Sequence, residues 1–209
     1  MRQNDMLLVI ATTNKGKTQE IIKLLENFPV TVKNLNDFSS VPDIVEDGRN
    51  FQENACKKAV EISRYLNLPA LADDSGLVVE ALGGAPGIHS ARYAGEHATD
   101  TQRCRKLLHE MDAHTNRRAA FHCVISIAVP NGKCLTYTGD CNGLITRSPA
   151  GSNGFGYDPV FYYPPLNQTF AQISMEEKSR ISHRGKALEK FMKDFQNAQA
   201  WILENLTTT

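Results

Sequence analysis

The segment MLLVIATTNKGK, residues 6–17, indicates the fold class of this chain. Residues 6–11 are all apolar, which is typical of a strand buried on both faces of a sheet. A polar turn follows, and apolar residues then recur at helical spacing over residues 17–28. Because a buried strand leads directly into an amphipathic helix, these residues predict the start of an α/β domain.

The remainder of the chain combines further helical and strand patterns. The expected elements are helices over residues 50–65, 100–111 and 182–206, and strands over residues 70–72, 119–129, 134–141 and 160–163. Pro130-Asn131-Gly132 predicts a hairpin, and a turn is expected at Gly76. Residues 30–50 are expected to be rich in loops. Since β–α units occur beside a hairpin, the sheet is predicted to be mixed.

Length and charge limit the classes of protein to consider. The 209 residues are 41% hydrophobic, which is enough for one domain over residues 1–209, built as one body or as two closely packed lobes. Lys plus Arg and Asp plus Glu both number 23. A protein that binds nucleic acid usually has a basic excess, so nucleic acid is not expected as the main partner. A small phosphorylated ligand needs only a local cluster of cations.

The sequence also bears on localisation. The segment at residues 6–13, which is apolar through Ala11, is far too short to span a membrane, and no later stretch approaches the ~18 apolar residues required. We therefore expect a cytoplasmic protein with no membrane partner. The five cysteines are odd in number, and none of them has C-x-x-C spacing. We expect them to be reduced thiols in or near the core.

Three polar sequences interrupt the apolar pattern where strands end, which is where α/β sheets often bind ligands. The first is Thr12-Thr13-Asn14-Lys15-Gly16-Lys17. Backbone N–H groups at a helix start attract phosphate, and a lysine adds a full charge. The alternative is an ordinary capping turn. The G-x-x-x-x-G-K frame of a Walker P-loop is absent.

The second polar sequence contains Asp73 and Asp74, directly after a predicted buried strand. Adjacent carboxylates repel each other unless a cation or a hydrogen-bond donor compensates them. Mg²⁺ is the natural cation, because it prefers carboxylate and phosphate oxygens. The alternative is that one aspartate caps a turn while the other is solvated.

The third polar sequence, residues 176–185, leads into the last predicted helix. Lys178, His183 and Arg184 are candidate contacts to phosphate or to a base, because their side chains offer several donors. The alternative is a solvated charged face with Ser182 as the N-cap of the helix.

Taken together, five blocks of sequence resemble the inosine-triphosphate pyrophosphatase family. The blocks are ATTNKGK (11–17), ENACKKA (53–59), LADDSGLVVEALGGAPGIHSARYAG (71–95), GSNGFGYDPVF (151–161) and EEKSRISHRGKAL (176–188). The resemblance implies an elongated, two-lobed α/β fold around a long mixed central sheet, with the nucleotide in a cleft between the lobes. It also implies a homodimer, a requirement for Mg²⁺, and hydrolysis of a nucleoside triphosphate to the monophosphate and pyrophosphate.

The resemblance also implies roles for individual residues. Asp74 resembles the family's proton acceptor and metal partner, and Asp73 lies beside it. Glu46 is similar to a metal-binding glutamate, in the part of the chain where the match is loosest. Lys58 resembles a phosphate-binding lysine. The further substrate contacts implied are Thr12, Thr13, Asn14, Lys15, Gly16, Lys17, Ser75, Phe155, Gly156, Tyr157, Asp158, Lys178, His183 and Arg184.

The function that the resemblance implies is removal of ITP, dITP and XTP from the nucleotide pool, which prevents their incorporation into DNA and RNA. One alternative is a related pyrophosphatase that acts on modified pyrimidine or methylated nucleotides. Another is a nucleotide-binding or RNA-associated module without catalysis. Paired Asp73 and Asp74 argue against that module, because binding alone seldom requires two neighbouring acids facing phosphate.

Overall fold

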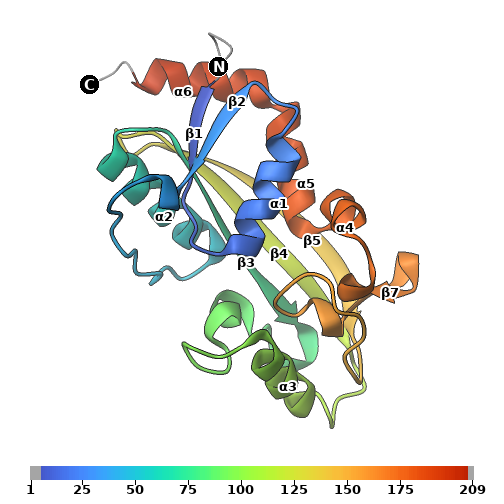
Figure 1. The fold of residues 1–209 in the computed structure, drawn as a ribbon. Coiled ribbons are helices and arrows are strands. Elements are labelled where there is room, and N and C mark those ends of the chain that lie inside the picture. Colours follow the sequence, from blue (N-terminus) through green and yellow to red (C-terminus); the bar gives the residue numbers. More distant parts are fainter. Residues whose placement is uncertain (1–5, 207–209) are drawn as a thin grey trace. The chain divides into compact units, whose positions relative to one another are not determined.

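A computed structural model describes residues 6–206, and these form a seven-stranded sheet with the strand order β2-β1-β3-β4-β5-β6-β7 (Figure 1). The strands are β1 Met6–Ile10, β2 Val30–Asn34, β3 Ala70–Val79, β4 Arg118–Ala128, β5 Cys134–Ile145, β6 Phe161–Tyr163 and β7 Gln168–Thr169. Strand β1 pairs in parallel with β2 and β3, whereas β6 pairs antiparallel with β5 and β7. The predicted α/β class with a mixed sheet is therefore confirmed.

Side-chain caps define where the main helices begin. The α-helices are α1 Lys15–Leu25, α2 Phe51–Leu66, α3 Asp100–Glu110, α4 Met175–Ile181, α5 His183–Lys193 and α6 Phe195–Leu206. Asn14, Asn50, Thr99 and Ser174 accept hydrogen bonds from the first turns of α1 to α4, which satisfies N–H groups that lack helical partners. None of the helices in residues 6–206 has the length and apolarity needed to cross a membrane.

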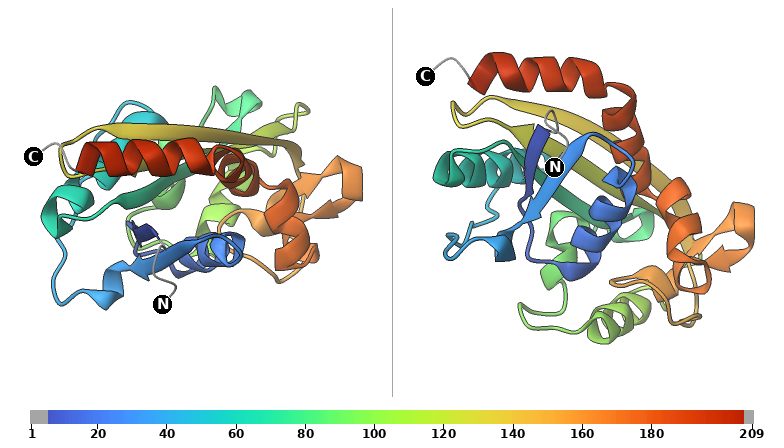
Figure 2. Two further views of the ribbon diagram at one scale, coloured as in Figure 1. Left: turned by 90° about the horizontal axis from the view of Figure 1, so that it is seen from above. Right: turned by 45° about the horizontal axis from the view of Figure 1, so that its top comes forward.

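The long helix expected over residues 182–206 is two helices, α5 and α6, separated at Asp194 (Figure 2). The Asp194 carboxylate accepts hydrogen bonds from Tyr137 Oη of β5 and Asn197 Nδ2, both at 2.7 Å. The apolar periodicity continues across this point, so the sequence pattern does not reveal the break. The polar partner on β5 is distant in the chain and is brought there by the fold.

Residues 30–50 are mostly loop, as expected, but residues 30–34 form strand β2, because their backbone pairs in parallel with β1 although their side chains are partly exposed. The turn expected at Gly76 is absent, since β3 runs without interruption from Ala70 to Val79. Asp73 and Asp74 thus lie within a strand rather than at its end, and partly buried lysines compensate their charges, as described below.

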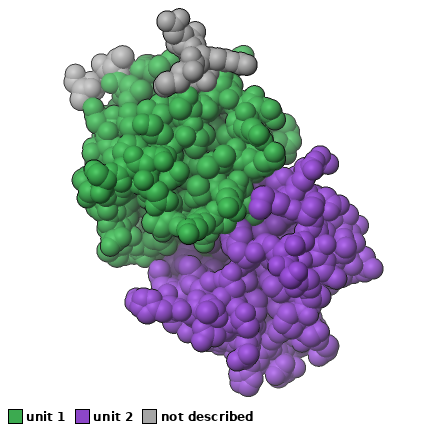
Figure 3. Space-filling model, viewed as in Figure 1, with its two compact units in different colours: residues 1–74, 124–138, 186–209 green, residues 75–123, 139–185 purple. Residues whose placement is uncertain are grey.

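The chain divides into two compact units (Figure 3). Unit 1 comprises the chain through Asp74, residues 124–138 and the chain from Lys186, whereas unit 2 comprises residues 75–123 and 139–185. Strands β3, β4 and β5 each contribute residues to both units. Each unit has its own apolar cluster, one around Val9, Ile62 and Ala72 and the other around Leu77, Phe121 and Phe161.

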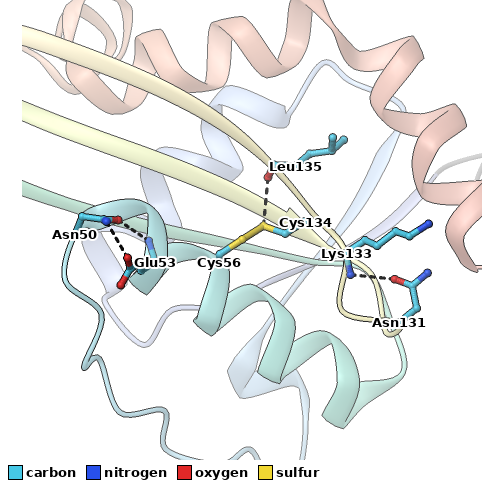
Figure 4. Close-up of a disulfide and its surroundings, with 7 residues drawn as sticks. All are labelled: Asn50, Glu53, Cys56, Asn131, Lys133, Cys134 and Leu135. Atoms are coloured by element: carbon cyan, nitrogen blue, oxygen red, sulfur yellow. Dashed lines mark hydrogen bonds between the residues drawn. A yellow bond between two sulfur atoms is a disulfide. The ribbon is translucent and has the colours of Figure 1, made fainter.

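Within unit 1, a disulfide joins α2 to the start of β5 (Figure 4). Cys56 and Cys134 are separated by 78 positions in sequence, and their Cα atoms lie 6.3 Å apart. The expectation that all five cysteines are reduced is therefore wrong for this pair. Cys104, Cys123 and Cys141 are free and buried, as expected. Spacing along the chain does not reveal a bond that depends on how α2 lies against the β4–β5 hairpin.

Candidate active site

Charged side chains meet around β3 in unit 1, and we call Lys17, Glu46, Lys58, Asp73 and Asp74 the lysine–carboxylate cluster. Successive side chains of an extended strand point to opposite faces. Accordingly, Asp73 forms an ion pair with Lys17 of α1, whereas Asp74 Oδ1 lies 3.5 Å from Lys58 Nζ of α2. Both aspartates are buried. The two neighbouring acids are therefore compensated by lysines from different helices.

Lys58 contacts both strand β3 and the loop that carries Glu46. Its Nζ donates to Glu46 Oε1 at 2.6 Å and to the carbonyl oxygen of Asp73 at 2.9 Å. Burial alone lowers the pKa of the Lys58 ammonium, but the charges of Asp74 and Glu46 outweigh burial and raise the pKa above its ordinary value. Lys58 therefore stays positively charged at neutral pH.

Asp74 has an unusual environment for a carboxylate. Its Oδ2 accepts a hydrogen bond from Asn54 Nδ2 at 3.1 Å. Burial raises the pKa of Asp74 above its ordinary value, and Lys58 and Lys17 only partly oppose this effect. A raised pKa makes a carboxylate a stronger base, and such shifts are frequent at catalytic positions.

The loop from Thr12 to Lys17 has a clear local role. Asn14 accepts the N–H of Lys17 at 3.1 Å and so caps α1, while Thr12 Oγ1 accepts the N–H of Asn14 at 3.2 Å. Thr13, Asn14 and Lys15 are exposed, and Gly16 is half-buried. The loop is thus a capping turn that also delivers Lys17 to Asp73.

The donor set of the cluster suits a hard cation. Asp74 and Glu46 both face the ammonium of Lys58, so two carboxylates converge on one positive charge. Among residues 6–206, no group of three or more His, Cys, Asp or Glu side chains is arranged to hold a metal unaided. Mg²⁺ is usually held by one or two carboxylates together with substrate phosphates and water. Two converging carboxylates fit that mode of binding.

In unit 2, Phe155, Asp158, Lys178 and Arg184 form what we call the aromatic–cation cluster. Lys178 Nζ, almost fully buried, lies 2.6 Å from Asp158 Oδ2 and 4.4 Å from the centroid of the Phe155 ring. Asp158 Oδ2 also accepts the N–H of Phe155 at 2.8 Å. Gly154 has a φ of +75°, and a Cβ there would overlap the Asp158 carboxylate. This loop is therefore built closely around the ion pair.

Arg184 is only 1% exposed and lies at the start of α5. Its Nη2 donates to Ser75 Oγ at 2.9 Å, and its Cζ lies 5.7 Å from the centroid of the Phe155 ring. Ser182 Oγ accepts the N–H of Gly185 at 3.1 Å, which is the N-cap role considered from the sequence. A Cβ at Gly185 would overlap the carbonyl group of Ser179, so glycine allows α5 to begin close to α4.

His183 and Tyr157 are packed against neighbours in unit 2. The His183 ring stacks on Phe121, with 4.6 Å between ring centroids and 9° between ring planes. Tyr157 Oη donates to the carbonyl oxygen of Ser90 at 2.9 Å, and burial raises its pKa. Gly156 is half-buried, and its N–H donates to Asp100 Oδ2 at 2.7 Å.

Two residues that matter here, Asn54 and Phe121, were not predicted from the sequence as site residues. Asn54 contacts Asp74 directly, and its sequence signal is a polar residue one helical turn before Lys58, inside the ENACKKA block. Phe121 supports the His183 ring, but its period-two pattern indicates only a core strand residue. The contact of Phe121 with His183 joins segments that are far apart in sequence.

The chain is similar in sequence and in fold to known proteins. The sequence model of the Ham1 family matches residues 8–194. A dITP/XTP pyrophosphatase from Syntrophobacter fumaroxidans is 56% identical over 196 residues, which are 94% of this chain and 84% of that protein. The solved structure of a HAM1 protein from Coxiella burnetii has a TM-score of 0.85 at 43% identity, covering 92% of this chain and 99% of that chain. A dITP/XTP pyrophosphatase from Geobacter sulfurreducens is 49% identical over 183 residues, covering 87% of this chain and 92% of that protein.

Proposed function

The chain belongs to the Ham1 family, and on this basis we propose that it hydrolyses ITP, dITP and XTP to the monophosphate and pyrophosphate. The observation that carries the proposal is the surroundings of Asp74. Its buried carboxylate lies between Lys58 and Asn54, beside Glu46 and the Lys17–Asp73 pair. Burying ionised groups is costly, so such a concentration of charge is a candidate functional site rather than ordinary core.

In the proposed reaction, water attacks the α-phosphorus, and the bond between that phosphorus and the bridging oxygen breaks, so that pyrophosphate leaves. Asp74 accepts the proton of the attacking water. Lys17 and Lys58 neutralise phosphate charge. Fixed positive charge and positioning supply most of the catalysis in phosphoryl transfer.

The proposed cofactor is Mg²⁺, held by Asp74 and Glu46 together with the phosphates of the substrate. Asp73 is the third carboxylate predicted from the sequence to bind the metal. It also pairs with Lys17 and keeps that side chain in place. When bound, the metal neutralises phosphate charge and lowers the pKa of a coordinated water. Two observations support the assignment of Mg²⁺. The candidate ligands offer only carboxylate oxygens, and Glu46 and Asp74 already share one cation, the ammonium of Lys58.

Selectivity for a 6-oxo purine is assigned to the aromatic–cation cluster and His183. Phe155 offers a partly exposed ring on which a base can stack. His183 and Arg184 carry N–H groups that can donate hydrogen bonds to a 6-oxo group. The amino group of adenine leaves such a donor unpaired, at a cost of ~1–3 kcal/mol. Gly156, Tyr157, Asp158 and Lys178 shape the loop that presents Phe155.

Pyrophosphate release measured with and without Mg²⁺ tests the proposal, using ITP, XTP, dITP, GTP, ATP and dUTP as substrates. We expect Mg²⁺-dependent release from ITP, dITP and XTP, with a large preference for them over GTP and ATP. Preference for dUTP would favour the pyrimidine alternative. Equal hydrolysis of every purine would refute the selectivity, and nucleotide binding without release would indicate the non-catalytic module.

The proposal also includes a homodimer in the cytoplasm, working as a single domain over residues 1–209 without nucleic acid or membrane. These features derive from the sequence resemblance and composition. Light scattering coupled to size-exclusion chromatography should give twice the chain mass of 23.2 kDa. A monomeric mass at micromolar concentration would contradict the homodimer.

A further inference from the structure

We propose that Asn54 is a positioning residue that holds the Asp74 carboxylate and the Glu46 loop in one arrangement. Its role depends on the proposed hydrolysis, in which Asp74 accepts a proton. Asn54 lies in the first turns of α2 and is 0% exposed. Buried amides persist in proteins where both ends find partners, and both ends of Asn54 do so.

The amide of Asn54 connects two segments that are distant in sequence. Its Oδ1 accepts the N–H of Gly48 at 2.8 Å, and its Nδ2 donates to Asp74 Oδ2 at 3.1 Å. The oxygen that accepts from the loop and the nitrogen that donates to the strand belong to one planar group. A shift of the loop is therefore transmitted to the hydrogen bond on Asp74.

The two oxygens of Asp74 have different partners on α2. Oδ1 faces the ammonium of Lys58 at 3.5 Å, whereas Oδ2 faces the neutral amide of Asn54. Asn54 and Lys58 are four residues apart and so share one face of the helix. A neutral donor restricts rotation of the carboxylate without placing a second full positive charge beside it. Such an arrangement suits a group that must accept a proton in a fixed direction.

The loop that carries Glu46 approaches Asn54 so closely at Gly48 that no side chain would fit at that position. A Cβ at Gly48 would lie 2.6 Å from Asn54 Oδ1 and 2.9 Å from Asn54 N. Two residues earlier, Glu46 Oε1 accepts from Lys58 Nζ at 2.6 Å. Asn54 thus anchors the loop next to the point where Glu46 reaches the lysine–carboxylate cluster.

The test compares Asn54→Asp and Asn54→Ser with the wild-type protein. Asn54→Asp keeps an acceptor for Gly48 but loses the donor to Asp74, whereas Asn54→Ser is too short to bridge both partners. Misplacing a catalytic group by about 1 Å lowers rates by up to ~10²-fold. We expect kcat with dITP to fall by ~10- to 100-fold in both variants, with KM changed less than about threefold because the lysines remain.

Asn50→Ala is the matched control, because Asn50 caps the same helix and accepts the N–H of Glu53 at 2.8 Å (Figure 4), whereas the donor to Asp74 is Asn54. We expect this variant to lower the unfolding midpoint while keeping the wild-type kcat. Hydrogen exchange supplies a readout that does not depend on activity. The Gly48 amide should exchange much faster in Asn54→Ser than in the wild type or in Asn50→Ala.

Wild-type kcat in either folded Asn54 variant would overturn the proposal, as would unchanged exchange at Gly48 in Asn54→Ser. If Asn54→Asp does not fold, Asn54→Ser decides the outcome. Calorimetry with inorganic pyrophosphate should give similar affinities for wild type and Asn54→Ser, and a loss of binding would also count against a positioning role. If the wild type releases no pyrophosphate from any triphosphate, the proposed function fails, and the exchange measurement still judges the link from Asn54 to Gly48.

Discussion

Arg184 donates a hydrogen bond from Nη2 to Ser75 Oγ at 2.9 Å, and Ser75 directly follows Asp74 in β3. The guanidinium at the start of α5 is thereby tied to the residue next to the proposed base. A buried arginine needs acceptors for its donors, and Ser75 supplies one of them. The two residues therefore depend on each other for their positions.

Replacing Ser75 by alanine tests this dependence. Hydrogen bonds to charged groups contribute about 1.5–3 kcal/mol, so we expect Ser75→Ala to reduce the free energy of unfolding by that amount. Urea denaturation measures the change. Ser152→Ala is the control, because Ser152 is an exposed serine of the same unit. Equal stability of the two variants would show that the contact contributes nothing.

Asp74→Asn tests the proposed proton acceptor. Removal of a general base usually slows turnover by ~10²- to 10⁴-fold, and we expect a loss in that range while pyrophosphate still binds. Steady-state kinetics and calorimetry separate the two effects. Asp43→Asn is the control, since Asp43 is exposed and in the same unit. Turnover close to that of the wild type would remove Asp74 from this role.

The disulfide between Cys56 and Cys134 should stabilise the folded protein. In the chain-entropy treatment, a crosslink over 78 positions contributes roughly 4.5 kcal/mol. We expect the double variant Cys56→Ser with Cys134→Ser to lose about that much free energy of unfolding. It should therefore unfold at a lower denaturant concentration than the wild type. Alkylation after denaturation without reductant should modify only Cys104, Cys123 and Cys141. Modification of all five cysteines under those conditions would contradict the bond.

Cys104 should be unreactive in the native protein at mildly alkaline pH. Burial raises the pKa of its thiol to about 12 from an ordinary 9.0, and the thiolate is the reactive form. At pH 8 its thiolate fraction is about a thousandth of that of an ordinary cysteine, and it rises only as the pH approaches 12. Mass spectrometry after brief iodoacetamide treatment measures this. Rapid native-state alkylation at pH 8 would contradict the buried thiol.

Much of the local structure could be predicted from the sequence, because periodicity and capping depend on near neighbours. The apolar run at residues 6–11 predicts β1, and the pattern over residues 50–65 predicts α2, which Asn50 caps. Strand β2 was missed because its partly exposed residues lack a clear apolar pattern. Its pairing with β1 forms only when the two segments meet.

The candidate site, like the local structure, could be predicted from the sequence only in part. The sequence alone determined which charged residues were worth considering, because Lys17, Lys58 and Asp74 are recognisable as residue types in distinctive blocks. Only the tertiary structure decided how they pair: Asp73 with Lys17, and Asp74 with Lys58 and Asn54. Side-chain type and local spacing are properties of the chain itself, whereas hydrogen bonds and ion pairs between distant residues depend on which face of a strand each residue occupies after folding.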